Sequence, residues 1–203
     1  MKRLLLSGII IFALIAAIGA IAMTGNFNEN KTAYNNYSPS DSLIDVAFQY
    51  PQGWNIFERR GSYSSFIQVQ IVEPAAAGDA TKMIASSIDV TIYPQSKAEF
   101  SPATAAGMAE DIKKKRLSLK GSQLISQTET KIAGVSAIEE TFSYAIFQMP
   151  LQKNAVPIPV IERIICFKKG DNYYTISFNQ DRERFAHYEK IFKRIAGSLR
   201  FLK

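Results

Sequence analysis

Short runs of alternating apolar and polar residues, each cut by proline or glycine, constrain the fold of this chain more than any other feature. In the first run the apolar members are Ile44, Val46, Phe48 and Tyr50. Side chains of a β-strand point alternately to opposite faces, so this alternation predicts a strand with one buried face. Residues 51–53, Pro-Gln-Gly, end the strand because proline cannot donate to a sheet ladder and glycine permits a sharp turn.

The same pattern predicts further strands along the rest of the chain. Trp54 follows the first turn directly and begins a second strand, which ends at Arg59-Arg60-Gly61. We expect the Trp54 ring either to fill the space between the sheet and a covering helix or to stack on a ligand. Further strands are predicted over 66–72, 88–92, 124–132, 135–147, 160–167 and 173–178, with turns at 133–134 and 169–172.

Two segments instead show the three- and four-residue spacing of an amphipathic helix. The first is predicted over 102–119, where Ser101-Pro102 supplies a hydroxyl cap followed by proline at the first helical position. The second is predicted over 182–199, with Asp181 as its cap. Its apolar stripe consists of Phe185, Tyr188, Phe192, Ile195 and Leu199.

The order of these elements predicts the fold class. Four short strands, a helix, four strands and a helix follow one another, and hairpins join most of the strands. The sheet is therefore predicted to be mainly antiparallel, with amphipathic helices packed on it, which makes the chain an α+β protein. The length of 203 residues suits one such domain, over 43–203, with an appendage before it.

The residues before that domain predict export or membrane anchoring. Leu4–Met23 holds no charge, is long enough to cross a bilayer as a helix, and follows Lys2 and Arg3. We expect residues 1–23 to be either a membrane anchor or a signal peptide with the cleavage motif Ala20-Ile21-Ala22. Residues 24–42, rich in Asn and Ser, are predicted to be a flexible linker. Both alternatives place the domain on the extracytoplasmic side of the membrane, either anchored or secreted.

The sequence offers little chemistry for catalysis. Its single cysteine, Cys166, lies in an apolar run and is predicted to be buried, and its single histidine, His187, is predicted to face solvent. The glycine-rich nucleotide-binding motifs, the G-x-S-x-G motif and the usual metal-ligand spacings are all lacking. We therefore expect no enzyme activity, no cofactor and no metal. The net charge of +6 is scattered apart from one run, so we expect no nucleic-acid binding.

Two segments are candidate partner-binding sites. The loop 149–159 has three prolines, and its apolar side chains are either tucked onto the core or offered to another protein. The second segment is a basic run, which is either a solvated helix end or a contact for anionic lipid headgroups or an acidic partner. The candidate residues are Met149, Leu151, Val156 and Ile158 in the loop, and Lys113, Lys114, Lys115 and Arg116 in the run.

Short motifs at the joints between the predicted elements resemble the PsbP/Mog-type fold family, over about residues 43–202. The residues that carry the resemblance are Phe48-x-Tyr50-Pro51-x-Gly53-Trp54, Ile88-x-Val90-x-Ile92, Gly134, Glu139-x-Thr141-x-Ser143-Tyr144, Tyr173-Tyr174-x-Ile176-x-Phe178, the segment Phe185–Phe192, and Ser198-Leu199-x-Phe201. The resemblance implies an α/β/α sandwich around an antiparallel sheet, in a bacterial exported relative. It also implies a binding or assembly module, but it supplies no metal-binding or photosystem-binding residue for this chain.

Three functions stay open on this basis. The first is a non-enzymatic, exported or membrane-tethered module that binds an unknown protein of the cell envelope. The second is a small-molecule or lipid-binding domain with a pocket between sheet and helices, which a deep apolar pocket would favour. The third is a divergent enzyme, which clustered carboxylates with shifted pKa values would favour.

Overall fold

Seven antiparallel strands form the main sheet of the protein. The computed structural model describes residues 32–61, 66–74, 86–94, 104–147 and 157–202. Across the sheet the strands lie in the order β3 (Asn55–Arg60), β4 (Ile67–Val72), β5 (Ser87–Pro94), β9 (Asn172–Asp181), β8 (Pro157–Lys169), β7 (Val135–Phe147) and β6 (Gln123–Ile132). The predicted strands and the mainly antiparallel pairing are thereby confirmed.

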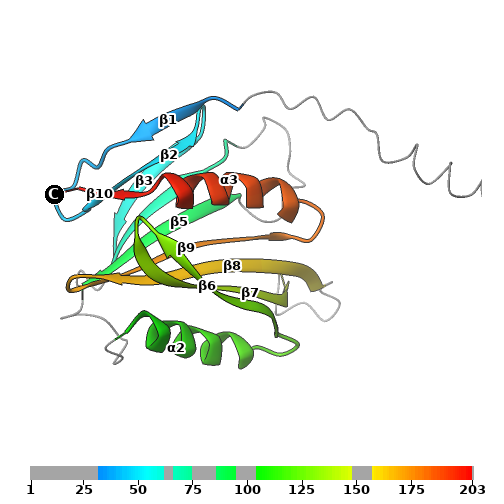
Figure 1. Cartoon of the computed structure of the whole chain (residues 1–203). Helices are drawn as coiled ribbons and strands as arrows, with labels where there is room; N and C mark the ends of the chain where they lie inside the picture. The colour runs from blue at the N-terminus through cyan, green and yellow to red at the C-terminus, as the bar shows by residue number, and fades with distance from the viewer. Residues whose placement is uncertain (1–31, 62–65, 75–85, 95–103, 148–156, 203) are drawn as a thin grey trace, which may run out of the picture. The chain divides into compact units, whose positions relative to one another are not determined.

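Two helices lie on opposite faces of this sheet (Figure 1). Helix α2 (Ala105–Leu117) contacts β6, β7 and β8, whereas α3 (Phe185–Ser198) contacts β9 and a strand outside this sheet, β2 (Val46–Pro51). All five residues of the stripe predicted on the last helix are buried. The α+β class is therefore confirmed.

Alternation along the strands builds an apolar core on each face. On β9, Tyr174, Ile176 and Phe178 pack with the residues of α3, whereas Tyr173 packs with those of α2. Cys166 on β8 belongs to the second cluster and is buried, as predicted. Burial disfavours the charged thiolate and raises the pKa of Cys166, so the residue is a core side chain and not a reactive thiol.

A second, three-stranded sheet contains a strand that sequence analysis missed. It consists of β1 (Tyr34–Tyr37), β2 (Val46–Pro51) and β10 (Arg200–Phe201), with β2 in the middle and antiparallel to both neighbours. The compact unit begins at Ala33, so the prediction of a linker over 24–42 is wrong for its second half. Pairing with β2, together with burial of the Tyr37 ring against Phe48, fixes this polar segment as a strand.

The stretch Pro-Gln-Gly turns the chain from this small sheet into the main one. Gly53 has φ +87°, a left-handed conformation that glycine adopts without strain, and the Trp54 N–H donates to the Pro51 carbonyl at 3.2 Å. The Trp54 ring then lies 5.9 Å from the Tyr188 ring of α3. The expectation that Trp54 fills space between sheet and helix is confirmed.

Both helix caps differ from those predicted. The hydroxyl of Thr104 accepts the N–H of Gly107, and α2 begins at Ala105, whereas Ser101 and Pro102 lie outside the described residues. At α3 the N-cap position is Arg184, and Asp181 is the last residue of β9. The Asp181 carboxylate still accepts the Arg184 N–H at 3.0 Å, so it holds the turn that leads into the helix.

Part of the segment predicted as a proline-rich loop is strand. β8 begins at Pro157 rather than at Val160, and Pro157, Ile158 and Pro159 pair with the end of β7. The pairing of β8 with β9 starts only at Val160, so the two prolines lie where β8 has one neighbour, as proline in a sheet requires. Residues 149–156 lie outside the described residues.

The N-terminal segment 1–23, predicted to be an anchor or signal peptide, also lies outside the described residues. Within residues 32–202, apart from the gaps given above, no helix has the length and apolar character needed to cross a membrane.

A buried carboxyl group lies on the face of the main sheet that α2 covers. Glu140 on β7 is 0 % exposed, and neither of its carboxylate oxygens has a hydrogen-bond partner among the described residues. Burial raises its pKa to about 7; nearby Lys113 opposes this rise and Glu110 adds to it. Burial likewise raises the pKa of Asp89 on β5 to about 6.

We expect Glu140→Gln to stabilise the protein at pH 8 by about 1–3 kcal/mol, because it removes an uncompensated buried charge. At a pH between the pKa of the unfolded state and the raised pKa of the folded state, this carboxyl group binds a proton in the folded protein but not in the unfolded one. Stability therefore falls as the pH rises from about 4.5 to about 7, and the variant should show a smaller fall. Urea unfolding at pH 5 and pH 8 measures this difference. A pH dependence in Glu140→Gln as steep as that in the control Glu129→Gln, exposed on β6, would contradict it.

Candidate functional site

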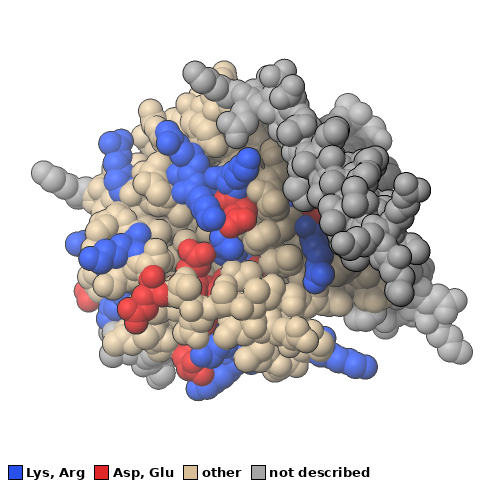
Figure 2. All heavy atoms as spheres, turned by 45° about the vertical axis from the view of Figure 1, so that its right-hand side comes forward, with Lys and Arg blue, Asp and Glu red and all other residues tan. Residues whose placement is uncertain are grey.

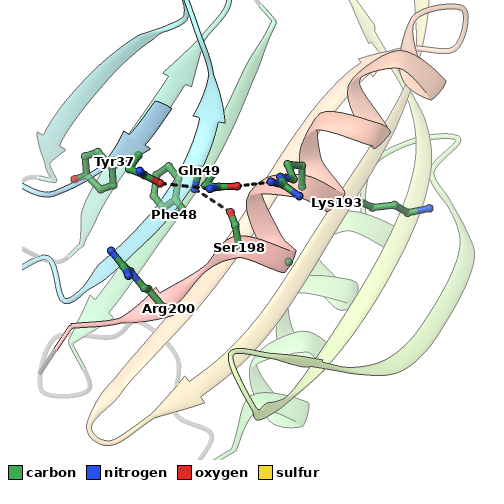
Figure 3. Close-up of a pocket in the computed structure, with 9 residues that line it drawn as sticks. Tyr37, Phe48, Gln49, Lys193, Ser198 and Arg200 are labelled. Atoms are coloured by element: carbon green, nitrogen blue, oxygen red, sulfur yellow. Dashed lines mark hydrogen bonds between the residues drawn. The ribbon is translucent and has the colours of Figure 1, made fainter. Parts of the chain in front are cut away.

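A groove of about 360 Å³ lies where β1 and β2 meet the C-terminal end of α3 (Figure 3). Two stacked aromatic rings, Tyr37 and Phe48, with centroids 4.6 Å apart, form part of its wall. The remaining lining residues are polar, basic or glycine: Asn36, Gln49, Lys193, Arg194, Gly197, Ser198 and Arg200.

Ser198 joins the helix end to the middle strand of the small sheet. Its hydroxyl oxygen accepts the backbone N–H of Gln49 at 2.9 Å and donates to the Ile195 carbonyl at 3.1 Å. β10 pairs with β2 only at Ala47 and Val46, so Ser198 supplies the bond that a longer strand would have supplied at Gln49. The groove lies at this place because α3 ends here, so the edge of β2 beyond β10 is paired by the Ser198 side chain and not by a strand.

Polar contacts hold the Gln49 and Arg194 side chains across the groove (Figure 3). The Gln49 amide oxygen accepts from the Arg194 guanidinium at 2.6 Å, and its amide nitrogen donates to Asn36 at 3.4 Å. The same guanidinium lies 5.4 Å from the centre of the Tyr34 ring. Arg194 therefore has a fixed position on one wall.

The charge of the lining has one sign. Lys193, Arg194 and Arg200 are basic, and none of the lining residues is acidic. The Lys193 side chain extends away from the labelled groove residues in Figure 3, and its ammonium pairs with Glu189 on α3 at 2.7 Å. Arg200 extends from β10 toward the side of Tyr37 and Phe48 in the same view. On the face drawn in Figure 2, Lys and Arg side chains gather in groups on a largely uncharged surface, in keeping with the net charge of +6.

A glycine forms part of the groove at a position where the helix does not require one. Gly197 is exposed in the last turn of α3, and a methyl group there would meet no described neighbour within 4 Å. Glycine destabilises a helix relative to alanine by roughly 0.5–1 kcal/mol. The absent side chain keeps the groove open.

A second hollow, of about 490 Å³, lies between the first turn of α2 and the β6–β7 hairpin. Its lining includes one cation, Lys131, and one carboxylate, Glu129, together with small and apolar side chains. Three hydroxyl side chains also line it, from Thr104, Thr130 and Ser136, but it lacks the one-sided charge of the groove. We take the groove as the candidate site.

The residues proposed from sequence do not form this site. Of the loop candidates, Met149, Leu151 and Val156 lie outside the described residues, and Ile158 is a half-buried residue of β8. His187 is exposed on α3, as predicted. Among the described residues, no group of three or more His, Cys, Asp or Glu side chains is placed to hold a metal ion.

The basic run does not form one continuous patch, because helical spacing turns its members to different sides. Lys113 pairs with Glu110 and reaches Gln127 on β6 at 3.3 Å. Arg116 makes two hydrogen bonds with Glu162 on β8, at 2.5 and 2.8 Å. Lys114 and Lys115 are exposed.

Sequence reasoning missed the groove residues Gln49, Arg194 and Arg200, but one signal for the site was present. Phe48 belongs to the first motif of the family resemblance and Ser198 to the last. The bond between the Gln49 N–H and Ser198 spans 149 positions and brings these motifs together in the groove. The two motifs at the ends of the domain therefore mark the place.

Comparison with known proteins identifies the family of the chain. A family model described as PsbP-like protein matches residues 7–201. The chain therefore belongs to the PsbP-like protein family. No curated protein sequence matches it.

Solved structures with low sequence identity share the fold. Cyanobacterial PsbP (CyanoP) from Synechocystis sp. PCC 6803 is 13% identical, with a TM-score of 0.54 over 89% of this chain and 99% of that one. The Ran-binding protein Mog1p of Saccharomyces cerevisiae is 8% identical, with a TM-score of 0.53 over 85% and 97%. A Bacteroides thetaiotaomicron protein is 12% identical, with a TM-score of 0.50 over 83% of this chain and 48% of that protein.

We expect Ser198→Ala to lower the free energy of unfolding by about 1 kcal/mol, because the Gln49 N–H loses its partner. The matched control is Ser118→Ala at the end of α2. Ser118 also donates to a carbonyl three residues back, at 2.7 Å, but it accepts no strand N–H in the described part of the chain. The control should change stability by about 0.5 kcal/mol or less. Equal losses in the two variants, measured by urea unfolding, would show that the bond to β2 contributes nothing.

We expect Arg116→Ala to destabilise the protein by about 1–3 kcal/mol, because it leaves the Glu162 carboxylate, 3 % exposed, without its cation. Lys114→Ala removes the same charge from an exposed position of the same helix and should have an effect within about 0.5 kcal/mol. Thermal unfolding of both variants tests this. Similar melting temperatures for the two would contradict a structural role for Arg116.

Proposed function

We propose that this PsbP-like protein is a non-enzymatic module that binds a protein partner at the cell envelope. The observation that carries the proposal is the groove of about 360 Å³, which two aromatic rings, two amides and three basic residues line. A concave site with a few convergent polar groups is the usual form of a binding site. Its lining has no carboxylate, histidine or cysteine, the Lys193 ammonium is paired with Glu189, and Tyr37 is buried, so binding is the role that its chemistry supports.

The N-terminal sequence supports a place outside the cytoplasm. Residues 4–23 are uncharged and follow Lys2 and Arg3, the pattern of a segment that starts in the cytoplasm and enters the membrane. We propose that this segment either anchors the domain or is cleaved after export. In either case the folded unit that starts at Ala33 acts on the extracytoplasmic side.

The fold is compatible with a role in protein binding. Mog1p, which has a similar fold, is described as a Ran-binding protein. Since fold and function separate easily, the groove of this chain and not the likeness is the basis of the proposal.

A small-molecule ligand is the second candidate function. The groove volume of about 360 Å³ falls at the lower end of the range of roughly 300–1,000 Å³ for ligand pockets. Such pockets are mostly apolar, whereas basic and amide side chains line most of this one. A protein partner is therefore the better match.

Photo-crosslinking in the native envelope tests the proposal. We expect benzoylphenylalanine at Asn36 of β1 or at Gly197 of α3, both lining residues of the groove, to capture the same protein from cells that make the full chain. Benzoylphenylalanine at Thr128, exposed on β6, is the control and should not capture it. Only lipid adducts from both groove positions, or the same protein from all three positions, would overturn the proposal.

A further inference from the structure

The cations of the groove differ in how they are held. Arg194 is fixed by the Gln49 amide and lies over the Tyr34 ring. The ammonium of Lys193 is paired with Glu189. The Arg200 side chain is exposed and makes no hydrogen bond, ion pair or ring contact with any described residue, although its backbone pairs with β2. The groove therefore contains one fixed guanidinium and one without a partner.

These two guanidinium groups favour an anion with two oxygens. A guanidinium presents a planar set of donors that matches a carboxylate or phosphate group in two parallel hydrogen bonds. Only one donor nitrogen of Arg194 is used by Gln49, so other N–H groups of this side chain are available. The lining has no carboxylate to compete for them.

The shape of the site indicates where the anion comes from. A bilayer surface is flat. Its headgroups therefore contact cations that protrude from a protein more readily than cations that line a concave groove. An extended peptide can instead lie in the groove, with its backbone within reach of the Asn36 and Gln49 amides, which can both donate and accept. The stacked rings of Tyr37 and Phe48 are almost fully buried and form an apolar part of the groove wall beside the cations.

We propose that the groove binds an acidic segment of the partner protein, with Asp or Glu carboxylates paired to Arg194 and to Arg200. This inference rests on the proposed function and adds the chemistry of the partner. It assigns distinct roles to the two arginines. Arg194 is positioned before binding by its contact with Gln49, whereas the exposed Arg200 side chain becomes ordered only when the segment is bound.

Fluorescence anisotropy with the full chain in detergent micelles tests the proposal. The probe is a labelled peptide of alternating Glu and Ser, and its Gln-Ser counterpart is the comparison. We expect the acidic peptide to bind, the neutral one not to bind, and the affinity to fall with salt. Arg200→Glu should weaken binding about tenfold or more, since a hydrogen-bonded ion contact is lost and a like charge is introduced.

The control is Lys120→Glu, which makes the same change of charge at an exposed position after α2. It should change the affinity about twofold or less, because exposed charges beyond a Debye length are screened. Arg200→Gln repeats the test without a new negative charge, in case Arg200→Glu does not fold. Equal weakening by Arg200→Glu and Lys120→Glu, or equal binding of both peptides, would overturn the inference.

Two further experiments distinguish an acidic protein segment from a lipid headgroup, and failure of this inference from failure of the proposed function. If vesicles of phosphatidylglycerol and phosphatidylcholine bound the protein through Arg200 while the acidic peptide did not, the anion would be a lipid headgroup and the inference would be wrong. If photo-crosslinking from Asn36 captured the same protein equally with Arg200 and with Arg200→Gln, the proposed function would stand and the acidic-segment inference would fail. Loss of that capture in Arg200→Gln but not in Lys120→Gln would support both.

Discussion

The pairing of the chain's last residues with β2 is the constraint on which the site depends. Arg200 and Phe201 pair with Ala47 and Val46, and the Leu202 N–H donates to the Asp45 carbonyl at 2.7 Å. These contacts start directly after α3 ends, so they hold the C-terminal end of the helix against β2. The groove lies at this junction. There the Ser198 side chain hydrogen-bonds the part of β2 that the short strand β10 does not reach.

Local pattern was enough to predict most of the main sheet and both helices. The alternation around Val90 and Ile176, and the stripe from Phe185 to Leu199, each reflect burial of one face, which any sheet covered by helices imposes. The hairpin at Ala133-Gly134 was predictable because positive φ values, here 49° and 81°, favour glycine at a tight turn.

Features that depend on distant partners were not predictable. Tyr34–Tyr37 has two central asparagines and no alternation, and it is a strand only because β2 offers an edge. Pro157 and Pro159 favour a loop by composition. They are nevertheless part of β8, because they pair with β7 on one side and lie before the point where β9 begins to pair on the other. For the same reason the site was missed, since Gln49 and Ser198 come together only through tertiary pairing. The basic run could have been predicted to split between two sides of α2. Residues 113 and 116 are three positions apart and lie on one helix face, whereas residues 114 and 115 lie on another.

The position of β1 has a mechanical consequence. Any tension along the chain before Ala33 enters the folded unit through Tyr34. β1 is joined to the unit by one ladder, with β2, and by a hydrogen bond at its far end, where the Tyr37 hydroxyl donates to Glu58 of β3 at 2.8 Å. Detaching this strand breaks four residue pairs and leaves all seven strands of the main sheet in place. Because Asn36 and Tyr37 of β1 form one wall of the groove, a pull on the chain before Ala33 that detached β1 would dismantle the groove while the main sheet stayed in place.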